Sequence, residues 1–204
     1  DDSGDSLSYT YTWKRTCASI NGCSGTSSLH SKTVTTSTYT YTLSTSLIQP
    51  DDTLTCEVIV SDGTSIDSPD SASTTVTNRD PIFVDYTLLP TGTWYNDTTG
   101  TCSVSSSDPD DAGTPTLTYA WTNDTSSMSL ATSRSITLSY PSVEPGDTVS
   151  CTPTATDLHG GSITGGLGIT IQNRAPSVTI SRSNTPSGTA YNDSTLKCTV
   201  TATD

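Results

Sequence analysis

The chain has 204 residues, a formal net charge of −13 at pH 7 and a sequence pI near 4.1. Ser and Thr make up about 38% of it, whereas charged residues contribute 14% and hydrophobic residues 30%. This charge argues against nucleic acid as a partner, because a phosphate backbone repels an acidic protein. No apolar run reaches membrane-spanning length, so we expect no membrane insertion.

Apolar residues alternate with Ser and Thr in short runs such as LSYTYTW, STYTYTL, LTCEVIV, TLTYAW and TVSCTPTAT. Alternation with a period of two is typical of half-buried strands, which also favour Thr, Tyr, Val and Ile. No stretch of ten residues carries a helical apolar stripe. The sequence therefore predicts an all-β protein.

The chain also contains an internal repeat of about 96 residues. QPDDTLTCEVIVSDG at 49–63 matches EPGDTVSCTPTATDL at 144–158, and TWYNDTTGTCSVSSSD at 93–108 matches TAYNDSTLKCTVTATD at 189–204. The linkers TNRDP and QNRAP match in the same way. A repeat of this length has the size of an immunoglobulin-like sandwich.

In chain order, residues 1–78 correspond to strands C through G of such a sandwich, around Trp13 and Cys56. Residues 79–174 contain a complete set: IFVDYTLLP (A), TGTCSVSSSD (B), a strand C with Trp121, RSITLSY (E), DTVSCTPTATD (F) and GSITGGLGITIQ (G). Residues 175–204 supply only the A and B strands, with Cys198.

The order Cys102, Trp121, Cys151 resembles immunoglobulin-like domains, in which a disulfide joins strands B and F and the Trp packs against it. The DPDD loop and the NRDP and NRAP linkers resemble the tandem Ig-like, PKD-like and cadherin-like repeats of large bacterial and archaeal surface proteins. This resemblance implies tandem Greek-key β-sandwiches and fixes no activity.

The separation of Cys and Trp predicts one domain split across the chain termini. If residue 204 of one unit is followed by residue 1 of another, Cys198 stands 19 positions before Trp13, the separation of Cys102 and Trp121. We therefore expect residues 1–78 and 175–204 to be halves of one sandwich. Three arrangements fit: a covalent polymer of domains, strand exchange between neighbouring chains, or pairing of the two ends within one chain.

Six cysteines in such a chain indicate an oxidising compartment. The resemblance implies a Cys102–Cys151 bond, and the same role for Cys56 and Cys198 across a boundary between units. Closing a loop of about 50 residues contributes roughly 4 kcal/mol in the chain-entropy model. We expect Cys17 and Cys23, in an insertion, to close a local hairpin between strands C and C′.

Clustered carboxylates are candidates for a hard cation such as calcium, which takes six to eight oxygens. The weak candidates are Asp108, Asp110, Asp111 and Asp157; the alternative is that acidic loops only keep the protein soluble. Arg79 and Arg174 in the linkers favour an ion pair or a carbonyl contact there. Three Asn-x-Ser/Thr sequons, at Asn96, Asn123 and Asn192, are glycosylation candidates.

The sequence contains no enzyme signature. His30 and His159 are the only histidines, both are expected in loops, and no G-x-S-x-G motif occurs. We therefore predict a non-enzymatic, extracellular structural unit of a filament, fibre or stalk, with identical or similar units as partners and no required cofactor. The alternative is a glycan-binding adhesin module of a larger surface protein.

Overall fold

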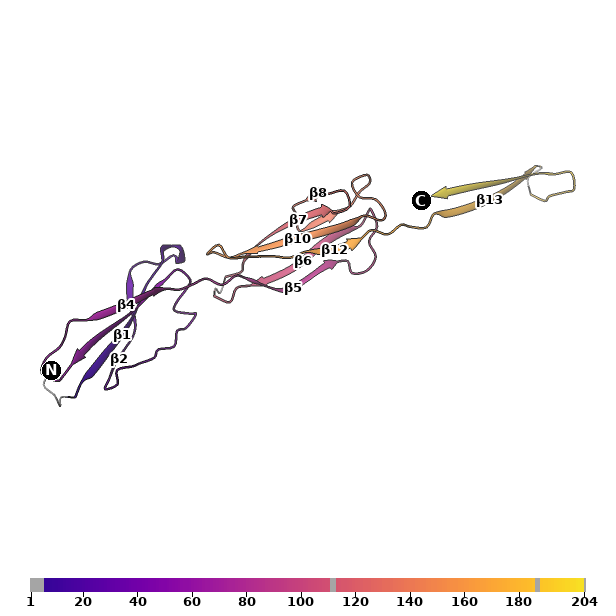
Figure 1. Ribbon diagram of the computed structural model, residues 1–204. Helices are drawn as coiled ribbons and strands as arrows, with labels where there is room; N and C mark the ends of the chain where they lie inside the picture. Colours follow the sequence, from indigo (N-terminus) through magenta and orange to yellow (C-terminus); the bar gives the residue numbers. More distant parts are fainter. Residues whose placement is uncertain (1–5, 111–112, 186–187, 204) are drawn as a thin grey trace. The chain divides into compact units, whose positions relative to one another are not determined.

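The computed structural model describes residues 6–110, 113–185 and 188–203 (Figure 1). Within these ranges the regular structure is β-strand apart from one 3₁₀ turn, η1 (Ser19–Asn21). The prediction of an all-β protein is confirmed. No helix in the described part of the chain is long and apolar enough to cross a membrane.

The strands form four antiparallel sheets. Their bounds are β1 Ser8–Thr16, β2 Thr26–Val34, β3 Thr53–Ser61, β4 Asp70–Thr75, β5 Ile82–Leu89, β6 Thr99–Ser107, β7 Thr116–Asn123, β8 Met128–Ala131, β9 Ser135–Thr137, β10 Thr148–Thr156, β11 Ser162–Thr164, β12 Leu167–Thr170, β13 Ser177–Thr185 and β14 Thr195–Thr203. By contacts the chain groups into two compact units: residues 1–87, 102–119 and 152–166, and residues 88–101, 120–151 and 167–204. The predicted domain bounds 1–78, 79–174 and 175–204 stay a prediction.

The first sheet has the order β2-β1-β3-β4. Trp13 is opposite Cys56 on β3 and His30 on β2, and Tyr11 is opposite Val58. Because side chains alternate along a strand, the aromatic residues of β1 and the apolar residues of β3 share one face. The predicted Cys17–Cys23 disulfide is present and closes the β1–β2 connection, with the Cα atoms 5.9 Å apart.

The middle of the chain forms an immunoglobulin-like sandwich. One sheet has the order β5-β6-β9 and the other the order β11-β10-β7-β8, with β12 also paired to β10. These are strands A, B and E in one layer and G, F, C and C′ in the other, the partition expected for this fold. In its core Trp94 and Trp121 are fully buried, with ring centroids 6.2 Å apart.

The predicted disulfide of this sandwich is confirmed. Cys56 and Cys198 are free thiols, whereas Cys102 and Cys151 are fully buried and bonded to each other. The disulfide therefore joins strand B to strand F, as the resemblance implied.

Strand G was predicted as one run but is divided into β11 and β12 at Gly165 and Gly166. The break lies opposite Pro153, which has no N–H to donate to the ladder; the Gly165 N–H donates to the Pro153 carbonyl at 3.0 Å. A Cβ at Gly165 would lie 2.8 Å from Tyr86 Oη, so this position has no room for a side chain.

Two further predictions are wrong. The run STYTYTL contains no strand, although its repeat counterpart forms β9. The reason is the partner: β9 pairs with β6, and no B strand lies beside residues 38–43 in the described structure. His30 was expected in a loop but lies on β2, whereas His159 lies in the turn after β10, as expected.

The hairpin β13–β14 forms a sheet of two strands, paired from Ser177 with Thr203 to Thr185 with Thr195 (Figure 1). Its large apolar side chains are exposed: Val178 by 58%, Ile180 by 67%, Leu196 by 60% and Val200 by 58%. A two-stranded hairpin alone is at best marginally stable in water. No second layer covers the apolar side chains of this hairpin in the described structure.

Gly100 offers a test of the packing around Trp94. A Cβ at this position would lie 2.1 Å from the Trp94 ring, whereas a Cβ at Gly168 would make only ordinary contacts of 3.7 Å or more. We expect Gly100→Ala to lower the free energy of unfolding by about 1–3 kcal/mol through overpacking. Urea unfolding followed by circular dichroism measures this, with Gly168→Ala as the matched control. Equal effects of the two variants would contradict it.

Candidate assembly surfaces

The first surface is the apolar face of the sheet β2-β1-β3-β4. Its strand β3 is the repeat counterpart of β10, and the two can be compared position by position. On β10, Val149, Cys151, Pro153 and Ala155 are all buried. Their counterparts on β3 are Leu54, Cys56, Val58 and Val60, of which only Leu54 is buried. The same strand thus keeps most of its apolar face accessible in the first sheet.

An aromatic cluster partly covers this face. Tyr39 and Tyr41, from the segment without strand structure, contact rings of the sheet: Tyr11–Tyr39 centroids are 5.9 Å apart and Trp13–Tyr41 centroids 6.4 Å apart. His30 stacks on Tyr41 at 4.8 Å, and its Nε2 lies 2.7 Å from the Tyr39 hydroxyl. These side-chain contacts therefore anchor residues 38–43 to the sheet.

The backbone of this segment lacks the ladder that its counterpart has. Thr99 and Thr101 of β6 pair with Thr137 and Ser135 of β9, and their hydroxyls lie 3.0 and 2.9 Å apart. The segment equivalent to β9, residues 40–42, has no such partner strand in the described structure.

Two side chains are also affected by the missing partner strand. Leu43 is 46% exposed, whereas its counterpart Leu138 is 3% exposed. Trp121 Nε1 donates to the Ser133 carbonyl at 2.9 Å, but Trp13 Nε1 is buried and has no hydrogen-bond acceptor among the described residues. The counterpart of Ser133 is Thr38, at the start of the same unpaired segment. A strand that ordered this segment would supply what both groups lack.

The second surface is the inner face of the hairpin β13–β14. Its connecting turn is built as in the complete sandwich: the Tyr95 N–H donates to Thr98 Oγ1 at 2.8 Å, and the Tyr191 N–H donates to Ser194 Oγ at 2.8 Å. Val104 of β6 is 7% exposed, but its counterpart Val200 is 58% exposed. The hairpin thus repeats the geometry of a sandwich strand pair without the covering layer.

Each surface carries one free cysteine at the position of the B–F disulfide. Cys56 is half-buried beside Trp13 and Cys198 is exposed on β14. Burial raises the pKa of the Cys56 thiol. The predicted bond between Cys56 and Cys198 is not formed in the single chain, so it stays a prediction.

A buried carboxylate that the sequence reading missed fixes one end of the first sheet. Asp52 is fully buried and accepts hydrogen bonds from Arg15 Nε at 2.5 Å, Asn21 Nδ2 at 3.0 Å and the backbone N–H groups of Ala18 and Gln49 at 2.9 and 3.0 Å. Burial raises the pKa of Asp52, but these hydrogen bonds lower it more, so it lies below its usual range. The signal available in the sequence was the repeated Asp before strand F.

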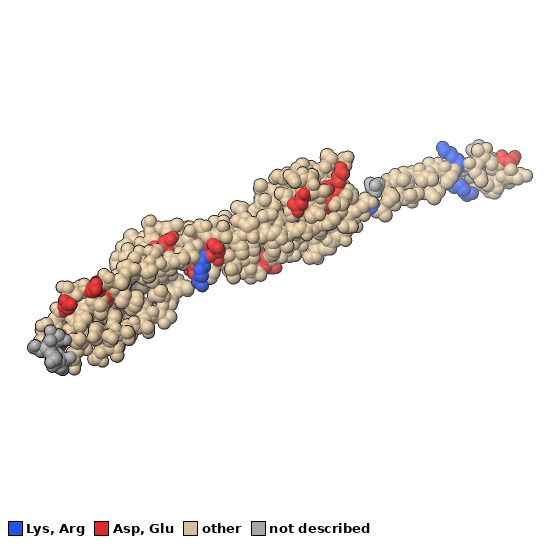
Figure 2. Space-filling model, in the orientation of Figure 1, with Lys and Arg blue, Asp and Glu red and all other residues tan. Residues whose placement is uncertain are grey.

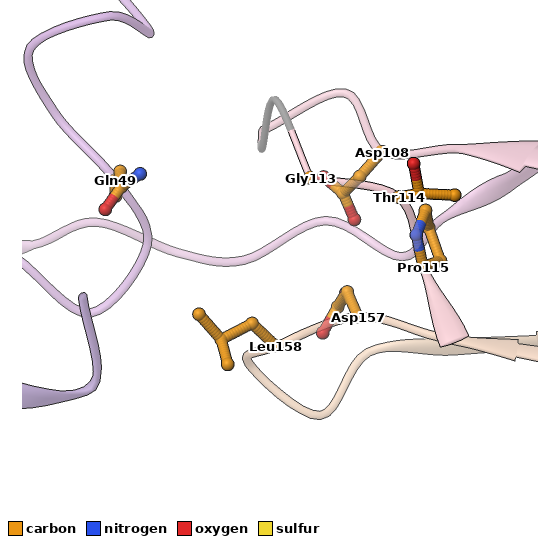
Figure 3. A pocket seen from close by; sticks show the side chains of 7 residues that line it. All are labelled: Gln49, Asp108, Gly113, Thr114, Pro115, Asp157 and Leu158. Atoms are coloured by element: carbon orange, nitrogen blue, oxygen red, sulfur yellow. The ribbon is translucent and has the colours of Figure 1, made fainter. Parts of the chain in front are cut away.

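The acidic loop between β6 and β7 forms a third feature (Figure 3). Asp108, Thr114 and Pro115 of this loop and Asp157 and Leu158 after β10 line a pocket of about 270 Å³. Figure 3 shows the two carboxylates on facing segments of it.

Donors from the protein itself occupy the candidate calcium ligands. Asp110 accepts from the Arg79 N–H and Nε at 2.6 and 2.7 Å, and Arg79 also donates to the Pro109 carbonyl at 3.1 Å. Asp157 accepts from Asn78 Nδ2 at 2.9 Å and from the backbone of His159 and Gly161 at 2.8 Å each. Arg79 therefore makes both contacts expected of it.

Within the described residues, no group of three or more acidic, His or Cys side chains has metal-site geometry. Asp111 lies outside the described residues. Calcium at this loop stays a prediction.

The three sequons differ in access. Asn96 is half-buried and Asn192 is exposed. Asn123 is 1% exposed, and its Nδ2 donates to the Ser142 carbonyl at 3.0 Å and to Asp147 Oδ2 at 2.7 Å. In the folded chain the Asn192 side chain is therefore accessible to solvent and the Asn123 side chain is not. Asn123 binds Asp147 in the sandwich, as Arg15 binds the corresponding Asp52 in the first sheet.

The fold and these surfaces define an all-β protein of immunoglobulin-like sandwich type. No family model and no curated protein sequence matches the chain. A crystal structure of the FN1-FN3 domains of chicken CNTN1 is similar, with 10% sequence identity and a TM-score of 0.31, over 83% of this chain and 58% of that chain. The chain thus spans less than two thirds of that neighbour, and the fold class is based on the sheet order described above.

The Asp52 cluster makes stability depend on pH. Because the pKa of Asp52 is lowered by folding, its contribution is present at pH values above the ordinary carboxyl pKa, about 4, and is lost as pH falls below it. We expect Asp52→Ala to cost about 1–3 kcal/mol at pH 7, since buried donors lose their acceptor. The cost should shrink as the pH falls below about 4.

Hydrogen exchange of peptides covering β1 and β3, measured from pH 7 to pH 3, follows this effect. The exposed Asp67 supplies the control, Asp67→Ala. A difference between wild type and Asp52→Ala that does not change with pH would contradict the assignment.

Proposed function

We propose that this chain is a structural unit of an extracellular filament, fibre or stalk, in which adjoining Ig-like units complete each other's sandwich. One observation carries the proposal: a C-C′-F-G sheet with an accessible apolar face and an A-B hairpin with an exposed apolar face occur in the same unit. These are the two parts that the complete sandwich in the same chain joins.

Charge supports a contact between these parts. The hairpin carries Arg182 and Lys197 against Asp193, a net charge of +1, in a chain of net charge −13. In Figure 2 Lys and Arg side chains are few on the visible face and acidic side chains form small separate groups. Residues 1–78 carry nine acidic and three basic side chains, a net charge of −6, which favours the approach of a hairpin of net charge +1.

The linkers suit a load-bearing role. Arg174 makes a bidentate pair with Asp97, with both N–O distances 2.7 Å, and its guanidinium lies 4.2 Å from the centroid of the Tyr95 ring. Bidentate Arg–carboxylate pairs fix geometry as well as charge. The prolines Pro81 and Pro176 restrict the backbone next to Arg79 and Arg174. Short, pinned linkers limit bending between beads of a fibre.

Disulfides support an extracellular location, since they persist in oxidising compartments. The repeats and linkers suit a bacterial or archaeal surface protein. The second candidate, a glycan-binding adhesin module, has one favourable observation: Tyr39, Tyr41 and His30 are aromatic or imidazole rings on the accessible face. These rings are engaged with each other, which favours the structural role.

Cysteine connectivity tests the proposal. We expect the purified 204-residue chain to associate under oxidising conditions and to give a ladder of multimers on a non-reducing gel. Peptide mapping should find Cys56 bonded to Cys198 of another molecule, alongside Cys17–Cys23 and Cys102–Cys151. The ladder should collapse on reduction and in Cys198→Ser.

A chain that stays monomeric at high concentration, with both thiols free, would contradict the structural role. Binding of isolated monomers to a glycan array would then favour the adhesin. A monomer with an intramolecular Cys56–Cys198 bond would show that the two ends close on each other.

A further inference from the structure

In the complete sandwich the residue before the A–B turn fills the core above strand B. Trp94 is fully buried, and its Nε1 donates to the Pro90 carbonyl at 2.7 Å. Its ring lies across Gly100 so closely that a Cβ there would be 2.1 Å from the nearest ring carbon. Only glycine fits at position 100 while Trp94 occupies this place.

In the hairpin β13–β14 both positions are changed together. The counterpart of Trp94 is Ala190, and the counterpart of Gly100 is Leu196. The turn between them is retained, because Tyr191 and Ser194 make the same hydrogen bond as Tyr95 and Thr98. The larger of the two side chains is thus in the loop in the sandwich (Trp94) and on the strand in the hairpin (Leu196). Leu196 is 60% exposed in the free hairpin.

The residue facing this place on strand E changes as well. Gly100 is opposite Ile136 of β9, and the counterpart of Ile136 in the first sheet's segment is Tyr41. Trp94, Gly100 and Ile136 together have about fourteen side-chain heavy atoms, and Ala190, Leu196 and Tyr41 about thirteen. Core substitutions that conserve total volume are the ones that are tolerated. The exchange is therefore balanced across the two separated parts of the chain.

We propose that the hairpin β13–β14 of one copy docks on the first sheet of a second copy in a single register, with Leu196 filling the place of Trp94. This inference rests on the proposed function and names its joint. Leu196 lies opposite Tyr41, Thr195 opposite Thr42 and Lys197 opposite Thr40, which turns residues 40–42 into a strand E. In this register Cys198 faces Cys56.

The joint is specific for this pair of surfaces. A hairpin with glycine at position 196 and alanine at position 190 leaves a cavity against Tyr41, and a tryptophan at position 190 with leucine at position 196 clashes as Gly100 shows. Positions 190 and 196 therefore have to match each other.

Four full-length chains test the register: wild type, Leu196→Gly, Ala190→Trp and the double variant. Sedimentation velocity under reducing conditions gives the association constant, and oxidation then gives the yield of intermolecular Cys56–Cys198. We expect each single variant to weaken association at least about tenfold, because one leaves a cavity and the other overpacks. The double variant should recover part of the loss, since it restores the pairing of Trp94 with Gly100 while Tyr41 remains in place of Ile136.

Thr199→Gly is the matched control, because Thr199 alternates with Cys198 and Val200 and lies on the other face of β14. It should weaken association less than Leu196→Gly. The substituted positions lie outside the central sandwich, so the circular dichroism melt of that sandwich should be the same in all five chains.

The outcomes separate the two proposals. If the wild type does not associate, the proposed function fails and the joint fails with it. If the wild type associates through Cys56–Cys198 but the double variant is no better than Leu196→Gly, the register is overturned and the filament unit stands. Association that none of the substitutions changes also overturns the register.

Discussion

The structure depends on one constraint: a sheet with one apolar face must be covered by a second layer. In the complete sandwich Trp94 and Trp121 meet between the layers and exclude water from Val149 and Ile171. Burying large apolar side chains of this kind contributes roughly 1.5–3 kcal/mol each. In the first sheet the same strand types are present, but the cover is incomplete in the described structure, and Val58 and Val60 stay half-buried.

The first sheet nevertheless has the same local geometry as the complete sandwich at the turn before strand F. The turn before strand F recurs in both copies, with positive φ at Asp51 (68°) and Gly146 (95°), and with the Asp51 and Gly146 N–H groups donating to Val76 and Ile171. Asp52 and Asp147 then accept from the residue two places after the strand C tryptophan, Arg15 and Asn123. These polar contacts do not need the covering layer. A sheet that is already ordered before a hairpin binds to it loses less conformational entropy on binding.

Much of this fold could be predicted from the alternation, the internal repeat and the resemblance to immunoglobulin-like domains. The strands around Trp121 and the Cys17–Cys23 and Cys102–Cys151 bonds are where the sequence indicated. The failures come from interactions between segments. Alternation in STYTYTL shows which residues face inward, but a strand also requires a hydrogen-bonded neighbour, which is absent beside it in the described structure.

The candidate site was less predictable for the same reason. Single residues such as Gly100, Ala190 and Leu196 carry no recognisable motif, and their relation becomes visible only through the ring of Trp94. Likewise, the role of Asp52 as a buried acceptor depends on Arg15 and Asn21, which are distant in sequence. A repeat shows that two positions correspond, whereas only coordinates show that two changes compensate.

A hairpin that docks on another copy must also avoid docking in the wrong register. Because side chains alternate, a slip of one residue would turn Leu196, Cys198 and Val200 of β14 to solvent and place Lys197 in the core; on β13 it would turn Arg182, which is opposite Cys198, away from the core. A slip of two would keep the apolar face inward but would separate Cys198 from Cys56 and move Leu196 away from Tyr41. In the proposed joint, packing would therefore reject the odd slips, and a Cys56–Cys198 bond would reject the even ones. The contact is also heterologous, since the surfaces of the two partners differ, and such contacts extend into open chains unless rotation closes them. If the two thiols are oxidised to a disulfide in the proposed register, a correctly formed joint would become covalent, whereas an incorrect one would stay reversible.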